Sequence, residues 1–113
     1  MADTDLPIEI DVDEAQQLLV GDPPPLLLDV RRLEEFQIAA LDNATLIPLH
    51  ELVLRLDELR PHRQRRIIVY CHHGYRSLRA AEGLRQAGFE RTQSMAGGIE
   101  QWSQRIDPAV PRY

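Results

Sequence analysis

Two short apolar segments constrain the fold of this chain more than any other feature of the sequence. They are "LLLDV", residues 26–30, and "IIVY", residues 67–70. Both are short and continuously apolar apart from Asp29, a pattern typical of strands that are buried on both faces of a parallel sheet. The sequence therefore predicts two central strands here, with a carboxylate at the end of the first.

Weaker strand patterns flank these two segments. They lie at residues 8–10, at residues 45–49 ("TLIPL"), where Pro48 should end the strand, and at residues 91–95 ("RTQSM"). Helical patterns alternate with the strands, at residues 12–19, 33–38, 49–59 and 77–87 and from the "AGGIEQW" segment at 96–102 onward. Strands that alternate with helices predict an α/β fold, a single domain with a mainly parallel central sheet of about five strands flanked by helices.

Local signals mark the ends of several helices. Asp11 with Glu14 three residues later resembles a capping box, and Gly88 is placed to end the helix at 77–87. The clearest amphipathic pattern joins five apolar positions spaced as i, i+3, i+4, i+7 and i+10, namely Leu49, Leu52, Val53, Leu56 and Leu59. We expect one helix there, ended by Pro61.

Composition narrows the class of protein. A chain of 113 residues with 43% hydrophobic content forms one domain with a packed core, and its net charge of −5 argues against a general nucleic-acid binder. Residues 1–10 lack the basic and apolar regions of a signal peptide, and no apolar run is long enough to span a membrane. One cysteine allows no internal disulfide, so we expect a soluble, cytoplasmic protein.

That single cysteine begins the segment "CHHGYRS", residues 71–77. In open parallel sheets the ligand sites lie just past the carboxyl ends of the strands, which is where Cys71 falls. Gly74 then leads into a helix, whose first N–H groups and dipole attract anions and favour a thiolate. With Arg76 adding positive charge, the loop is predicted to make Cys71 a nucleophile and to bind an anionic substrate.

Two other roles for Cys71 are open. A free cysteine is commonly a small buried hydrophobe, but the spacing of Gly74 and Arg76 before a helix favours the nucleophile. A metal site beside His72 and His73 is disfavoured, because three consecutive residues converge poorly on one ion and no second ligand cluster occurs in the sequence. We expect no metal and no cofactor, and we expect the two histidines to line the loop.

The number of residues between cysteine and arginine separates two enzyme classes. Cysteine-dependent phosphatases have five, whereas Cys71 and Arg76 have four, and Ser77 stands where the phosphatase arginine would fall. The loop resembles the Cys-x-x-Gly-x-Arg-Ser loop of the rhodanese family. Three further segments resemble that family in the same order, "LLLDVRRLEEF" (26–36), "NATLIPL" (43–49) and "AGGIEQW" (96–102).

The resemblance implies a rhodanese-like domain over residues 1–113, with a core at about 8–105 and a C-terminal tail at 106–113. It implies a sulfurtransferase in which Cys71 takes the sulfane sulfur of thiosulfate or a persulfide and passes it to cyanide or a thiol. The substrate would lie in the active-site loop formed by His72, His73, Gly74, Tyr75 and Arg76. The supporting residues would be Asp29, Arg31 and Ser77, with Asp29 accepting N–H bonds and Arg31 pairing with Glu35.

Other functions stay open beside this one. Cys71 could receive sulfur from a partner protein as a relay module, and an arsenate reductase or phosphatase or an inactive scaffold are the remaining alternatives. No membrane or nucleic-acid partner is expected. The sequence does not decide the oligomeric state, nor whether Asp29 and Arg31 do more than stabilise the fold. Residues 39–44, "AALDNA", depart from the family's Gly-His-Ile-Pro-Gly-Ala, and Asn43 is expected to adopt the left-handed conformation of the replaced glycine.

Overall fold

The computed structural model describes residues 6–113 and is built on one five-stranded parallel sheet. The strand order is β1-β5-β4-β2-β3, so the two apolar segments β2 and β4 pair at the centre. The strands are β1 (Glu9–Ile10), β2 (Leu26–Asp29), β3 (Thr45–Leu46), β4 (Ile67–Tyr70) and β5 (Thr92–Met95). The predicted α/β fold with about five parallel strands is confirmed.

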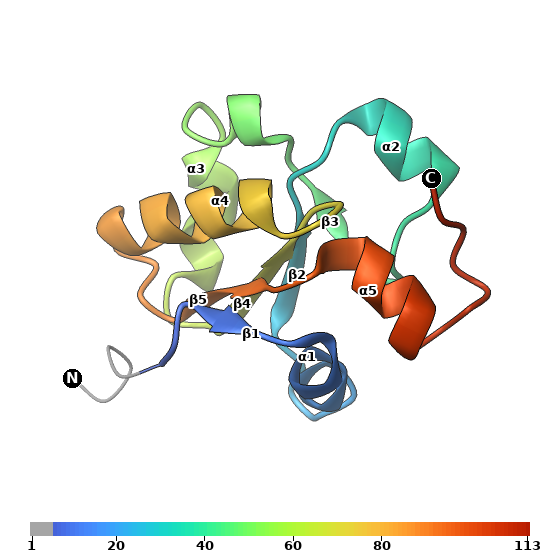
Figure 1. Ribbon diagram of the computed structural model, residues 1–113. Coiled ribbons are helices and arrows are strands. Elements are labelled where there is room, and N and C mark those ends of the chain that lie inside the picture. Colours follow the sequence, from blue (N-terminus) through green and yellow to red (C-terminus); the bar gives the residue numbers. More distant parts are fainter. Residues whose placement is uncertain (1–5) are drawn as a thin grey trace.

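Helices cover both faces of the sheet (Figure 1). The α-helices are α1 (Val12–Leu19), α2 (Leu33–Ile38), α3 (Leu56–Leu59), α4 (Tyr75–Gln86) and α5 (Gly98–Arg105). Helices α1 and α5 pack on one face, and α3 and α4 pack on the other. Among residues 6–113, no helix is both long enough and apolar enough to cross a bilayer. The prediction that residues 1–10 lack the features of a signal peptide rests partly on residues 1–5, which lie outside the described residues.

The hydrophobic core has two parts, one on each face of the sheet, because successive side chains of β2 and β4 point to opposite faces. Leu28 and Val69 face α3 and α4, whereas Leu27 and Ile68 face α1 and α5. All four of these side chains are buried. A strand that is apolar at every position therefore fits here because helices cover both faces.

The expected single helix at residues 49–59 is wrong. The segment consists of a 3-10 helix η2 (Leu49–Glu51), a run of turns, α3, and a second 3-10 helix η3 (Arg60–His62). Leu52 and Leu59 are buried, but Val53 is 79% exposed. Spacings of three residues, as from 49 to 52 and from 56 to 59, also suit the three residues per turn of a 3-10 helix, so they do not require a continuous α-helix. Pro61 lies in the first turn of η3 and does not end the segment.

Other local predictions are confirmed. The side chain of Asp11 accepts a hydrogen bond from the backbone N–H of Glu14 at 2.9 Å, which caps α1. Gly88 has a φ of 103° just after α4, and Asn43 has a left-handed φ of 65°. Helix α4 begins at Tyr75, two residues before the expected start at Ser77, so its first turn belongs to the cysteine loop.

The glycine pair at the start of α5, Gly97 and Gly98, lies against the cysteine loop. The first N–H groups of α5 reach the loop carbonyls, with Ile99 donating to Cys71 at 2.9 Å and Glu100 donating to His72 at 3.1 Å. Gly98 lies against the same carbonyls with a φ of 59°, and a Cβ atom on it would lie 2.4 Å from the carbonyl oxygen of Cys71. Only a glycine allows this close approach.

We expect Gly98→Ala to lower the free energy of unfolding by about 3 kcal/mol or more, because it combines a strained φ with a backbone overlap. The matched control is Gly83→Ala in α4, where a Cβ meets nothing within 4 Å and φ is not positive. That control should raise the free energy of unfolding by about 0.5–1 kcal/mol. Urea unfolding of both variants tests this, and a Gly98→Ala protein as stable as the wild type would contradict it.

Candidate active site

The cysteine loop joins the carboxyl end of β4 to the first residue of α4. Cys71 directly follows Tyr70, the last residue of β4, and Gly74 is the N-cap of α4 with a left-handed φ of 105°. A Cβ atom at Gly74 would also lie 3.1 Å from the backbone nitrogen of Gly97. The glycine therefore lets the chain turn tightly enough to aim its N–H groups back at the cysteine.

The sulfur of Cys71 is enclosed by hydrogen-bond donors. Sγ accepts the backbone N–H of Gly74 at 3.1 Å and the backbone N–H of Ser77 at 3.3 Å. The Oγ of Ser77 lies 3.5 Å from Sγ and 2.7 Å from the Oγ of Ser94 on β5. Cys71 is only 1% exposed. Two backbone N–H donors therefore point at the sulfur, as the sequence predicts for the start of the helix, although one of them comes from Ser77.

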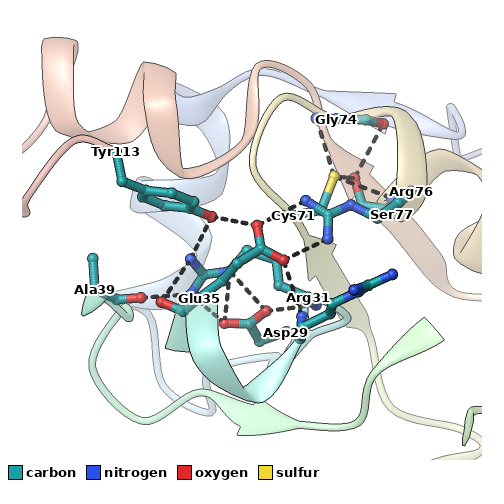
Figure 2. Close-up of polar contacts among 10 residues, drawn as sticks. Asp29, Arg31, Glu35, Ala39, Cys71, Gly74, Arg76, Ser77 and Tyr113 are labelled. Atoms are coloured by element: carbon teal, nitrogen blue, oxygen red, sulfur yellow. Dashed lines mark hydrogen bonds and ion pairs between the residues drawn. The ribbon is translucent and has the colours of Figure 1, made fainter. Parts of the chain in front are cut away.

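Arg76 points toward the sulfur and is held by a carboxylate. Its Nη1 and Nη2 donate to the two carboxylate oxygens of Glu35 on α2 at 2.7 and 3.0 Å (Figure 2). This bidentate pair raises the pKa of Arg76, and the nearby Cys71 adds to the same effect. Arg76 thus stands beside the cysteine as predicted, but its charge is already compensated.

Asp29 and Arg31 form a buried ion pair, each with a fully buried side chain. The Nε and Nη2 of Arg31 donate to the carboxylate of Asp29, the latter at 2.7 Å, and the backbone N–H of Arg31 donates to Asp29 at 2.9 Å. Asp29 therefore accepts N–H bonds, as expected. The expected pair between Arg31 and the Glu35 side chain is wrong, because Arg31 reaches only the Glu35 carbonyl oxygen, at 3.4 Å. The Glu35 carboxylate faces Arg76 instead.

The tail of the chain folds back onto the site. The hydroxyl of Tyr113 donates to Glu35 Oε2 and accepts from Arg31 Nη1, both at 2.8 Å. Burial raises the pKa of Tyr113 to about 12, so this phenol keeps the proton that it donates. Its ring stacks on His72 with centroids 4.0 Å apart and an interplanar angle of 11°.

The two histidines stack on each other and do not converge on a common point. Their ring centroids are 4.0 Å apart, and His73 is exposed. Burial lowers the pKa of His72, and His73 adds to the effect, so His72 is neutral near pH 7. Within residues 6–113, no group of three or more histidine, cysteine or carboxylate side chains is arranged to hold a metal ion. Tyr75, the remaining loop residue, is 80% exposed.

The structure thus gathers Cys71, Gly74, Arg76 and Ser77, with His72 at the edge and the Asp29–Arg31 pair behind. Sequence reasoning named Glu35 but gave it Arg31 as its partner instead of Arg76, and it missed Ser94 and Tyr113. Nothing in the sequence near Tyr113 marks it as a neighbour of the cysteine loop, because its contacts span 78 and 82 positions along the chain.

Comparisons with known proteins agree on one family. The profile described as "Rhodanese-like domain" matches residues 11–105. The chain is 31% identical over 102 residues to a protein from Allochromatium vinosum named "Sulfurtransferase", covering 90% of this chain and 94% of that protein. A solved "Rhodanese-like Domain Protein from Staphylococcus aureus" superposes with a TM-score of 0.79 at 26% identity, over 93% of this chain and 97% of the other.

Larger proteins also contain a similar domain. The chain is 35% identical over 106 residues to an "Adenylyltransferase and sulfurtransferase" from Ogataea parapolymorpha, covering 94% of this chain and only 27% of that protein. The chain therefore spans about a quarter of the length of this curated relative.

The Glu35–Arg76 pair predicts a specific pH dependence of stability. Arg76 lowers the pKa of Glu35 from 4.5 to about 2. The ionised pair therefore stabilises the fold above pH 4.5, and this contribution is lost as the pH falls toward 2. We expect Glu35→Gln to lower the free energy of unfolding at pH 7 by about 1–2 kcal/mol, since the pair is partly exposed.

The difference between wild type and Glu35→Gln should shrink as the pH falls from 4.5 to 2, as measured by urea unfolding at several pH values. Glu34→Gln is the control, because Glu34 is an exposed neighbour in the same helix, and it should stay within about 0.5 kcal/mol of wild type. A constant difference between Glu35→Gln and wild type at every pH would count against the assignment.

Proposed function

This chain belongs to the family of rhodanese-like domains, and we propose that it is a sulfurtransferase whose Cys71 carries the transferred sulfur as a persulfide. The observation that carries the proposal is the position of Sγ, which accepts N–H bonds from Gly74 and Ser77 at the start of α4. Such a cradle stabilises negative charge on sulfur through donors that are already in place before the reaction.

In the first half-reaction the Cys71 thiolate attacks the outer, sulfane sulfur of the donor. A new S–S bond forms to Cys71 while the donor's own bond to that sulfur breaks, and the leaving group departs with the bonding electrons. With thiosulfate the leaving group is sulfite, and with a persulfide it is a thiolate. The product is an anionic persulfide on Cys71, which the loop N–H groups and Arg76 stabilise.

In the second half-reaction an acceptor attacks the outer sulfur of this persulfide. A cyanide acceptor becomes thiocyanate, a thiolate acceptor becomes a new persulfide, and Cys71 departs from the outer sulfur as the regenerated thiolate. Oxidation states balance over the cycle, so no cofactor is required. The two steps share one enzyme intermediate, which predicts ping-pong kinetics.

A second candidate function is a sulfur relay, in which Cys71 receives sulfur from a persulfide on a partner protein. The charges around the site favour it. Arg31, Arg76 and Arg112 are paired with Asp29, Glu35 and Glu100 respectively, at 2.7, 2.7 and 2.6 Å. A site whose cations are already compensated attracts a dianion such as thiosulfate less than one with a free cation. A bacterial relative, 30% identical over 99 residues, is itself named a "Putative sulfur carrier protein".

Intact mass separates these possibilities. We expect the wild-type protein to gain one sulfur atom from glutathione persulfide, and cyanide should remove it. Cys71→Ser, which lacks the only cysteine, should gain nothing. Labelling by thiosulfate at similar concentrations supports the thiosulfate enzyme, whereas labelling by the persulfide alone supports the relay. A wild-type protein that gains sulfur from neither donor excludes the proposed function.

Arg76 should affect the reaction more than the fold. We expect Arg76→Ala to slow persulfide formation by roughly 10–100-fold, the range that follows from losing a charge-assisted contact worth about 1.5–3 kcal/mol. Arg79→Ala removes the same charge from an exposed position one turn later in α4 and should change the rate by less than about twofold. Both rates are measured by quenching the reaction at set times and recording the intact mass. Equal rates for the two variants would remove Arg76 from the site.

A further inference from the structure

The C-terminal tail lies against the cysteine loop, where the ring of Tyr113 stacks on His72. Cys71 is 1% exposed, and the loop residues Gly74 and Ser77 contact its sulfur from one side. In Figure 2 the side chains of Arg76, Glu35 and Tyr113 lie together on the other side of the sulfur. Of these three residues, only Tyr113 lies outside a helix.

The contacts of Tyr113 connect it to residues that surround the cysteine. Its hydroxyl bridges Glu35 and Arg31, and its ring covers His72, the residue that follows the cysteine. Arg112, the residue before it, donates to Glu100 Oε2 at 2.6 and 3.0 Å. Three residues before Tyr113, the carbonyl oxygen of Val110 accepts a hydrogen bond from Ser103 Oγ at 2.7 Å.

Side-chain contacts hold the end of the tail in place. Within residues 6–113, the described backbone hydrogen bonds involve none of residues 111–113, which are held by side-chain contacts. Arg112 is 59% exposed, so its ion pair is weakened by solvent. The Nε2 atom of His72, whose ring stacks on Tyr113, is buried without a hydrogen-bond partner among the described residues and lies 3.9 Å from Glu100 Oε1.

We propose that Tyr113 is a specificity-determining residue, whose ring narrows the entrance to Cys71 so that small sulfur donors and acceptors reach the sulfur while bulky ones must first displace the tail. Its role in sulfur transfer rests on the proposed function, whereas the steric restriction does not. The reagents that reach Cys71 directly are then small ones, such as cyanide and short thiols.

Alkylation of the only cysteine tests the restriction without any sulfur transfer. The probes are N-methylmaleimide and N-(1-pyrenyl)maleimide, which share one neutral reactive group and differ in size. Each rate constant is measured by intact mass and divided by the rate constant of the same probe with a small free thiol. We expect the wild type to disfavour the pyrenyl probe at least tenfold after this correction.

Tyr113→Ala should raise the pyrenyl rate at least fivefold and the methyl rate less than twofold. Tyr113→Phe keeps the ring that stacks on His72 but loses the hydroxyl contacts, so its pyrenyl rate should fall between those of wild type and Tyr113→Ala. If Tyr113→Ala folds poorly, the comparison of Tyr113→Phe with the wild type tests the proposal. Equal acceleration of both probes in Tyr113→Ala would mean general loosening of the loop and would overturn the proposal, as would rate constants equal to those of the wild type for both probes.

The same proteins separate this proposal from the proposed function. A wild type that shows the size restriction but takes no sulfur from thiosulfate or glutathione persulfide keeps Tyr113 as a gate and removes the sulfurtransferase. A wild type that takes sulfur but reacts equally fast with both probes keeps the sulfurtransferase and removes the role of Tyr113 as a gate.

Discussion

The pairing of β2 with β4 is the constraint on which the site depends. Asp29 lies opposite Tyr70 in this parallel register, so the residues that follow each strand emerge side by side at the same edge of the sheet. One strand continues into Arg31 and then Glu35, and the other continues into Cys71 and then Arg76. A shift of one residue in this register would turn the apolar side chains of β2 to the wrong faces, so the packing of the core also fixes the alignment of the site.

A buried arginine then connects the two strand ends to the tail. A guanidinium has five N–H donors, and burying its charge is costly unless they are satisfied. In Arg31 the donors go to the Asp29 carboxylate and to the carbonyl oxygens of Glu35 and Ala39, and one goes to the hydroxyl of Tyr113. The tail therefore completes the hydrogen bonding of a residue behind the cysteine. This gives Tyr113 a physical reason to lie at this position, beyond contact with the loop surface.

Much of the fold and the centre of the site could be predicted from the sequence, because local signals and burial patterns carry them. The strands at 26–30 and 67–70, the helix at 33–38 and the left-handed Asn43 all follow from apolar runs, periodicity and φ preferences. The prediction for the segment at 49–59 failed because the three-residue spacings within its apolar pattern also fit a 3-10 helix. Tyr113 could not be predicted, since its contacts are set by tertiary packing and involve no local pattern. The choice of Glu35 as partner of Arg76 likewise depends on how α2 sits on the sheet.

The compensated charges and the enclosed sulfur favour the same kind of chemistry. A persulfide on an open, strongly cationic site would attract many anions and thiols, each of which could remove its outer sulfur. Here the Arg76 charge is balanced by Glu35, the sulfur is buried, and N–H donors that carry no net charge contribute part of the stabilisation. Such donors favour an anionic sulfur without drawing in competing anions from a distance, because dipoles act over shorter ranges than charges. The arrangement therefore stabilises the proposed intermediate while leaving the choice of reagent to the shape of the entrance.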